Sequence, residues 1–174
     1  IEANVEGVEF SVINTDLQAL NSSPAPNKIP IGAKLTGGLG AGGNPEVGEN
    51  AAKEDSESIE SAVSGADMVI LTAGMGGGTG TGSIPIVADL AKKSGALTVA
   101  VVTTPFEFEG SGRMKNAREG LEKLRENVDS LIVIPNEQVF KVIEKKINFR
   151  EAFQIADKLL CQGVQGISEI ITKP

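Results

Sequence analysis

Three short apolar runs recur along the 174-residue chain. They are Met68–Thr72, Leu97–Thr103 and Leu131–Ile134. Each run is continuous and rich in β-branched residues, a pattern typical of strands that other elements cover on both faces. A fourth segment, Val8–Ile13, is also predicted to be a strand.

Helical periodicity fills the stretches between and after these runs. Apolar residues recur at positions 0, +3, +4 and +7 from Ile59 to Ala66, and a similar stripe runs from Met114 to Val128. Two further helices are predicted from about Gly80 to Lys93 and from Arg150 to about Ile171. Alternating strands and helices of this length favour right-handed crossovers and a three-layer α/β fold, with a parallel sheet flanked by helices. No repeat or linker divides the sequence, so residues 1–174 are interpreted as one domain.

Glycine is concentrated in two uncharged clusters, Gly37–Pro45 and Gly74–Gly82. The second cluster follows a predicted strand and precedes a predicted helix, which is where parallel α/β folds bind their ligands. Glycine lets successive backbone N–H groups converge on an anion, and the helix N-terminus adds partial positive charge. The cluster therefore predicts a polyphosphate site made of main chain, with Thr79 and Thr81 as hydroxyl donors. A tightly packed glycine turn is the alternative.

Two common nucleotide motifs fit the sequence poorly. No Gly-x-x-x-x-Gly-Lys-Ser/Thr occurs, so the lysine that reaches the terminal phosphates in such loops is missing. A dinucleotide fingerprint can be aligned with Gly38–Gly43, but only a short possible strand, Ile29–Ile31, precedes it. The acids about 20 residues further on, Glu57 and Glu60, lie within a helical pattern and not at a strand end. A dinucleotide-binding Rossmann domain remains the weaker alternative.

Composition narrows the function further. Sixteen Lys and Arg against 23 Asp and Glu give a net charge of −7, which disfavours binding to nucleic acid or to an anionic membrane surface. The sequence has no His and a single Cys, Cys161, which argues against His-based triads, common zinc sites and an intrachain disulfide. Neither a signal peptide nor a membrane-spanning stretch is expected, so the predicted location is the cytoplasm.

The glycine loop also carries a resemblance to a known family. Gly-Gly-Gly-Thr-Gly-Thr-Gly, at Gly76–Gly82, is the phosphate-binding motif of the tubulin/FtsZ family. Together with Thr104–Gly110 and Val164–Ser168, it makes the chain resemble the bacterial cell-division GTPases of that family from about Glu6 to Pro174. The resemblance implies a Rossmann-like GTP-binding domain that assembles into head-to-tail protofilaments of the cytokinetic ring at mid-cell.

The resemblance implies nucleotide-binding roles residue by residue. The loop that faces the γ-phosphate end matches Ala41, Gly42 and Gly43. The main phosphate loop matches Gly74, Gly76, Gly77, Gly78, Thr79, Gly80 and Thr81. Glu109 and Arg113 match a pair of residues that holds the ribose, and Asn136 matches a residue near the sugar and base. Phe153 and Asp157 match the residues that stack on guanine and recognise it.

The chemistry of these side chains agrees with the implied roles. A carboxylate at Asp157 can accept hydrogen bonds from guanine N1–H and N2–H₂ together, whereas adenine has no such pair of donors. Phe153 lies four residues earlier, on the same helix face. From the residues alone, Asp157 can also be a solvated acid and Phe153 a core residue. Glu109 and Arg113, at i and i+4, can be an exposed ion pair.

The resemblance also implies parts that lie outside this sequence. A first strand and a Gly-x-Gly-Gly-Gly-Asn loop would precede Ile1. A central helix with an acidic Asn-x-Asp-Phe-Ala-Asp segment, a second domain and a tail for membrane-adaptor proteins would follow Pro174. The expected cofactors are GTP or GDP, with Mg²⁺ bound through the phosphates.

Catalytic acids are expected from a neighbouring subunit, so no catalytic residue and no metal ligand is expected within the chain. Turnover by the chain alone is then expected to be weak or absent. A non-hydrolysing interaction module on the same fold is a further alternative.

Overall fold

The protein is described from a computed structural model, which covers residues 7–143 and 146–172. Its strands form two sheets, and all of the paired strands are parallel. The larger sheet has the order β3-β4-β5, with β3 at Met68–Gly74, β4 at Leu97–Thr104 and β5 at Ser130–Pro135. These strands confirm the three apolar runs, and they extend each run by one or two residues.

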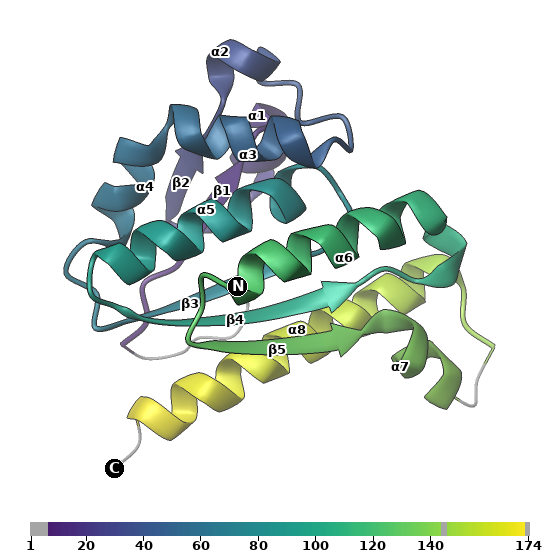
Figure 1. The fold of residues 1–174 in the computed structure, drawn as a ribbon. Helices are drawn as coiled ribbons and strands as arrows, with labels where there is room; N and C mark the ends of the chain where they lie inside the picture. Colours follow the sequence, from purple (N-terminus) through teal and green to yellow (C-terminus); the bar gives the residue numbers. More distant parts are fainter. Residues whose placement is uncertain (1–6, 144–145, 173–174) are drawn as a thin grey trace.

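Helices cover both faces of the larger sheet, as predicted (Figure 1). On one face lie α5 (Thr79–Lys93) and α6 (Ser111–Arg125), and on the other lies α8 (Phe149–Thr172). The smaller helical elements are α1 (Leu17–Ser22), α2 (Ala33–Thr36), α3 (Pro45–Glu54), α4 (Ser56–Val63), α7 (Asn136–Val142) and the 3₁₀ turn η1 (Glu107–Glu109). No helix in the described ranges is long and apolar enough to cross a bilayer.

The central strand β4 is buried from both sides. Ala100 and Val102 pack with Ile84 of α5 and Leu124 of α6 in one apolar cluster. On the opposite face α8 approaches so closely that a Cβ on Gly163 would lie 3.2 Å from Cγ1 of Val101. Successive residues of a strand point to opposite faces, so the continuous apolar run Val99–Val102 lets β4 pack against both helical layers.

The smaller sheet pairs β1 (Ser11–Asn14) with β2 (Asn27–Pro30). The strand expected at Val8–Ile13 is therefore shifted toward the C-terminus. Its partner is short because Pro24 and Pro26, which lack an N–H group, precede β2. With four residues available in β2, only Ser11–Asn14 find partners along the ladder.

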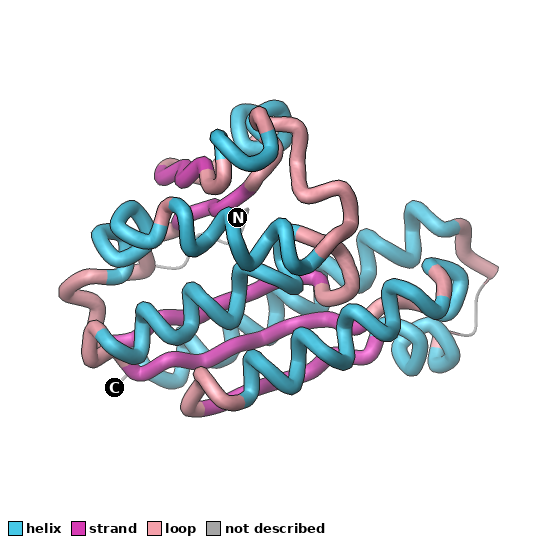
Figure 2. Tube along the Cα trace, turned by 45° about the horizontal axis from the view of Figure 1, so that its top comes forward, coloured by secondary structure: helices cyan, strands magenta, loops and turns pink. Residues whose placement is uncertain are grey.

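Helices α3 and α5 connect the two sheets. A cluster around Ala51, Ala52 and Val87 also includes Ile13 of β1 and Leu71 of β3. The two helices cross at glycines: a Cβ on Gly82 would overlap the carbonyl oxygen of Pro45, and a Cβ on Gly48 would overlap that of Gly78. Figure 2 shows the resulting arrangement, with the two sheets separated and α3 and α5 side by side.

Candidate functional site

The loop between β3 and α5 leaves backbone donors free. The Met75 N–H donates to the Thr103 carbonyl (2.8 Å) and the Gly76 N–H to Oγ1 of Thr81 (2.7 Å), which fixes the start of the loop. The next two N–H groups, of Gly77 and Gly78, donate to no other described residue. They stand at the N-terminus of the 15-residue helix α5, where further N–H groups lack helical acceptors. The sequence motif thus forms a cluster of donors suited to an anion.

A second glycine loop lies directly against the first. Gly42 and Gly43 have left-handed φ angles of +59° and +76°, and their N–H groups also donate to no other described residue. A Cβ on Gly78 would lie 2.8 Å from both Cβ of Ala41 and the Asn44 nitrogen. The two segments that carry these free donors, though distant in sequence, therefore lie against each other.

The Gly38–Gly43 segment does not lie directly between a strand and a helix, which is the position that a dinucleotide-binding loop requires. The helix α2 intervenes between β2 and Gly38–Gly43, so this segment is no strand-to-helix turn. The acids Glu57 and Glu60 lie on α4, as the helical pattern indicated. This geometry argues against the dinucleotide-binding alternative.

The two threonines of the loop are already engaged within the chain. Thr81 is 2% exposed and its hydroxyl oxygen accepts from Gly76, so it holds the loop from beneath. The hydroxyl of Thr79 is paired with that of Thr15, with the oxygens 2.5 Å apart. Thr15, a buried residue just after β1, carried no sequence signal and was not foreseen. Both hydroxyls therefore stabilise the loop through bonds within the chain. The sequence pattern predicted them only as donors to the polyphosphate.

Helix α6 borders the main loop. Arg113 and Glu109 form the expected ion pair (Nη1 to Oε1, 3.3 Å), and Glu109 also accepts from the Phe106 N–H (2.9 Å). The pair lies at the loop, since a Cβ on Gly76 would be 2.9 Å from the Arg113 carbonyl oxygen. The Arg113 side chain is 55% exposed, so a cation is available beside the free N–H groups.

A second α6 residue, Asn116, touches both glycine loops. Its Nδ2 donates to the carbonyl oxygens of Gly43 (3.4 Å) and Gly76 (3.3 Å). Sequence reasoning missed this residue because a single Asn on the polar side of a helix has no distinctive pattern.

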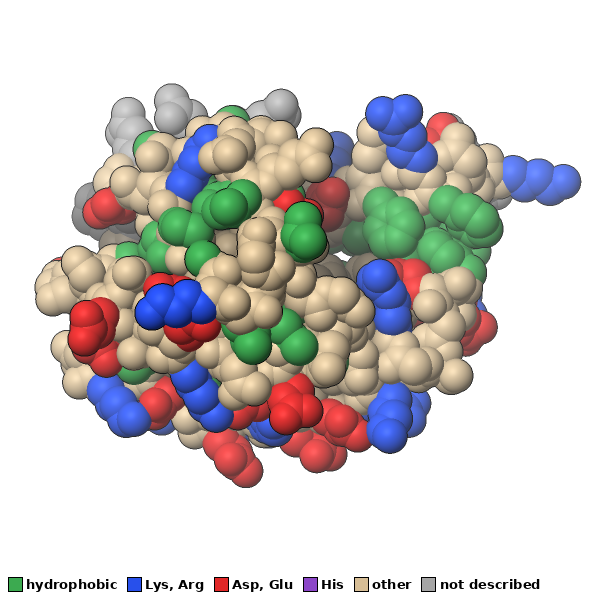
Figure 3. All heavy atoms as spheres, turned by 90° about the horizontal axis from the view of Figure 1, so that it is seen from above, with side chains coloured by type: hydrophobic (Ala, Val, Ile, Leu, Met, Phe, Trp, Pro, Cys, Tyr) green, Lys and Arg blue, Asp and Glu red, His purple; other side chains and the backbone are tan. Residues whose placement is uncertain are grey.

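An aromatic cluster continues from the loop toward α8. Pro105 lies against the loop, since a Cβ on Gly76 would be 2.6 Å from Cγ of Pro105. The next residue, Phe106, is 2% exposed. Phe153 of α8 meets Phe106 edge-on at 5.4 Å between ring centroids and remains 42% exposed. Phe153 therefore combines core packing with an open ring surface. Figure 3 shows hydrophobic side chains gathered at the end of the molecule that carries α7 and the start of α8.

Asp157 lies one turn beyond Phe153 on α8 and is exposed. The helices α5 and α8 lie on opposite faces of the sheet, but both begin at the edge where the strands end (Figure 1). Pro105 and Phe106, which follow β4, connect the glycine loop with the aromatic cluster at this edge. The amide-rich loops and the start of α8 are thus parts of one rim.

Asn136 opens α7 directly after β5 and is 5% exposed. Its Oδ1 is buried and accepts no hydrogen bond from the described residues. An unpaired buried acceptor costs about 1–3 kcal/mol, so native structures rarely retain one without a use. A donor on a bound molecule would satisfy it, which fits the expected place of Asn136 beside a sugar and base.

An ionic contact joins α6 to α3 behind the glycine loops. Glu49 of α3 contacts Nζ of Lys53 (2.6 Å) and of Lys123 on α6 (2.9 Å). Hydrogen bonds from both lysines lower the pKa of Glu49, and the hydrogen bond to Glu49 raises the pKa of Lys123. This contact fixes the position of α3, which begins immediately after the second glycine loop.

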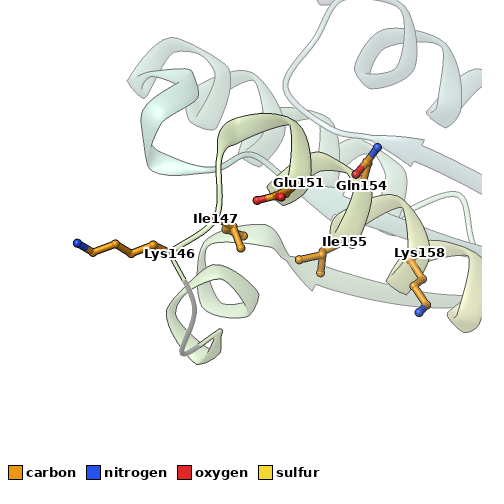
Figure 4. A pocket seen from close by; sticks show the side chains of 6 residues that line it. All are labelled: Lys146, Ile147, Glu151, Gln154, Ile155 and Lys158. Carbon is orange, nitrogen blue, oxygen red and sulfur yellow. The ribbon is translucent and has the colours of Figure 1, made fainter.

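A separate hollow of about 370 Å³ lies on α8 (Figure 4). Its walls share no residue with the glycine loops. The side chains that line it belong to Lys146, Ile147, Glu151, Gln154, Ile155 and Lys158. Glu151 is engaged in a reciprocal cap with Asn148 at the start of the helix, with bonds of 3.0 and 2.9 Å. Within the described ranges, no group of three or more His, Cys, Asp or Glu side chains could hold a metal ion.

Comparison with known proteins identifies the family that the chain resembles in sequence and in fold. The sequence matches the family model described as "Tubulin/FtsZ family, GTPase domain" over residues 3–144. The structure matches an empty FtsZ dimer from M. jannaschii with a TM-score of 0.95 and 54% identity, covering 98% of this chain and 50% of that one. A W319Y mutant of FtsZ from M. jannaschii matches with the same TM-score and identity, and 51% of it is covered.

A more distant similarity extends to CetZ1 from Haloferax volcanii, a GDP-bound monomer, with a TM-score of 0.79 and 24% identity over 91% of this chain and 51% of that one. At that identity the likeness concerns the fold alone. The chain spans about half the length of these solved proteins. Because M. jannaschii is an archaeon, the resemblance is not confined to bacterial proteins.

Proposed function

The chain belongs to the tubulin/FtsZ family, as its GTPase domain, and from this we propose that it binds GTP and GDP along the rim described above. The observation that carries the proposal is the abutting pair of glycine loops, whose free N–H groups come from two distant segments. An acidic protein can hold a polyphosphate there because the donors are main-chain amides and a helix N-terminus.

The phosphates are assigned to the N–H groups of Gly77, Gly78, Thr79 and Gly80 and of Gly42 and Gly43. Arg113 adds a positive charge at the loop, and Glu109 holds Arg113 in place. Mg²⁺ bound to the phosphates would neutralise negative charge as it develops during phosphoryl transfer.

Base recognition is assigned to the start of α8. The open side of the Phe153 ring offers a stacking surface, and the carboxylate of Asp157 accepts from guanine N1–H and N2–H₂. The unpaired Oδ1 of Asn136 accepts from a donor on the sugar or base. Adenine would leave the Asp157 carboxylate without its donors, which gives guanine preference.

We further propose that hydrolysis depends on self-association. In this scheme subunits stack head to tail, and an acidic segment from outside residues 1–174 of a neighbour orients the attacking water. The match to an FtsZ dimer supports an assembling protein. The proposed cellular role is a cytoplasmic filament of the division ring at mid-cell, joined to the membrane by adaptor proteins. Residues 1–174 alone are then expected to turn over GTP weakly or not at all.

Calorimetric titration with GTP, GDP, ATP and NADH tests the nucleotide proposal. The natural full-length protein is expected to bind GTP and GDP and to bind ATP at least tenfold more weakly. Asp157→Asn, an isosteric change at an exposed residue, is expected to remove this preference, whereas Gln162→Ala on the same helix leaves it intact.

Two outcomes would contradict the proposal. Competition between NADH and GTP would support a dinucleotide enzyme instead. Absence of any guanine nucleotide binding would indicate a non-hydrolysing interaction module on the same fold.

A further inference from the structure

We propose that Asn116 is a positioning residue, which orients the Gly76–Gly77 peptide and holds the two glycine loops at the spacing that a triphosphate requires. The inference rests on the proposed function, because it concerns how the same loops are prepared for their ligand. Neither the glycine motifs nor the family resemblance pointed to this residue.

One carboxamide serves both loops. A side-chain NH₂ group has two hydrogens, so Nδ2 of Asn116 can donate to the Gly43 and Gly76 carbonyls together. In the described residues neither carbonyl accepts another hydrogen bond. Asn116 is therefore the only described side chain that bonds to both loops, and it does so from the rigid helix α6.

The hydrogen bond to Gly76 also sets the direction of a backbone N–H group that is proposed to bind phosphate. In a trans peptide the carbonyl oxygen and the next N–H point in opposite directions. Holding the Gly76 oxygen toward α6 thus turns the Gly77 N–H away from α6. That N–H is one of the loop's free donors.

Without this bond the peptide could rotate easily. It lies between two glycines: Gly76 has φ of +114°, and a Cβ built on Gly77 would meet nothing within 4 Å. Asn116 is thus the restraint that keeps the donor facing the ligand.

The bond to Gly43 acts on the second loop in the same way. Gly42 and Gly43 are both left-handed and have no atoms near a built Cβ, so local packing does not fix them. The two ends of this turn, Ala41 and Asn44, lie against Gly78, and Asn116 adds a hydrogen bond between them, at Gly43. A longer polyphosphate reaches more of both loops, so loss of Asn116 is expected to weaken GTP binding more than GDP binding.

The test compares Asn116→Asp and Asn116→Gln in the natural full-length protein. Asp has the shape of Asn but no donor, and it places a carboxylate against two carbonyl oxygens. We expect Asn116→Asp to raise the dissociation constant of a non-hydrolysable GTP analogue by about tenfold and that of GDP by less. Asn116→Gln, which keeps the NH₂ group, is expected to recover part of the affinity.

A matched control and a spectroscopic measurement separate positioning from general damage. Asn127→Asp removes an Nδ2 bond to the Lys123 carbonyl at the other end of α6 and is expected to leave binding unchanged. The ¹⁵N–¹H signal of Gly77 is expected to shift in nucleotide-free Asn116→Asp but not in Asn127→Asp. If Asn116→Asp acted by a general loss of folding, its melting temperature would fall well below that of Asn127→Asp.

Equal affinities for wild type and Asn116→Asp overturn the inference and leave guanine nucleotide binding by wild type intact. A loss that is equal for GTP and GDP, without a change at Gly77, also overturns it. If the wild type binds no guanine nucleotide, the proposed function and this inference fall together.

Discussion

Thr15 and Thr79 join the smaller sheet to the start of α5 through their hydroxyl groups. The residues are 64 positions apart, and their Oγ1 atoms lie 2.5 Å from each other. Thr15 follows β1 and is 1% exposed, while Thr79 is the first residue of α5. The bond therefore ties the smaller sheet to the helix N-terminus that carries the proposed phosphate site.

Replacing Thr15 by Val tests this connection. The change conserves volume but leaves the Thr79 hydroxyl without its buried partner, so we expect a loss of about 1–2 kcal/mol in the free energy of unfolding. Chemical denaturation measures it, and Thr15→Ser, which keeps the hydroxyl, is the control. A Val variant as stable as wild type would show that the pair contributes little.

Two neighbouring glycines are expected to respond differently to alanine. A Cβ on Gly78 would lie 2.8–2.9 Å from Ala41 and from the backbone of Asn44, whereas a Cβ on Gly77 meets nothing within 4 Å. Gly78→Ala should therefore force the loops apart and cost about 1–3 kcal/mol of stability. Gly77→Ala should leave the melting temperature within a few degrees of wild type. Thermal unfolding without nucleotide compares them, and equal losses would argue against the described loop packing.

The contact between Glu49 and Lys123 predicts a pH-dependent contribution to stability. The pKa of Glu49 is lowered from 4.5, so its contribution is present above that value and is lost as the pH falls through the lower folded pKa. The pKa of Lys123 is raised from 10.5, so its contribution is present below 10.5 and is lost as the pH rises through the higher folded pKa.

Lys123→Met should accordingly destabilise the protein at pH 7 by about 0.3–1 kcal/mol, because both lysines around Glu49 are more than half exposed. The difference from wild type should shrink as the pH falls below 4.5 and through the lowered pKa of Glu49, and it should also shrink at high salt. Lys115→Met is the control, since its 3.9 Å contact with Glu119 is highly exposed. Urea titrations across this pH range provide the measurement, and a difference independent of pH would contradict the ionic explanation.

Phe153→Leu tests the stacking role of the ring. Leu keeps apolar contact with Phe106 but offers no aromatic face, so stability should change by less than about 1.5 kcal/mol. Guanine nucleotide affinity should fall by about five- to fiftyfold, as for loss of one base–aromatic stack. Fluorescence competition with a labelled GTP analogue measures it. Unchanged affinity would limit Phe153 to packing.

Local patterns in the sequence were sufficient to predict the larger sheet and its helices. The strands β3, β4 and β5 are continuous apolar runs because both faces of each strand are covered, and such runs are visible without knowing the partners. The placement of α5 also followed from the glycine loop, which no sheet interior would contain. The strand β1 was misplaced because its ends depend on the length of β2, which is a property of the pair.

The parts of the site that sequence reasoning missed all depend on tertiary contacts. Asn116 and Thr15 acquire their roles from residues 40 and 64 positions away in the sequence. A single Asn on a helix or a single Thr after a strand forms no repeating pattern, so the sequence does not indicate which residue it contacts. The glycines, by contrast, were recognisable because a backbone that must touch another backbone excludes every other residue type.

The proposed use of main-chain N–H groups to bind the phosphates has an evolutionary consequence. No substitution except one by proline can delete the N–H groups of Gly77 or Gly78, and these groups keep their protons throughout the physiological range of pH. Harmful changes in these loops should therefore be ones that add atoms, and the natural variation tolerated there should be limited by space and not by charge.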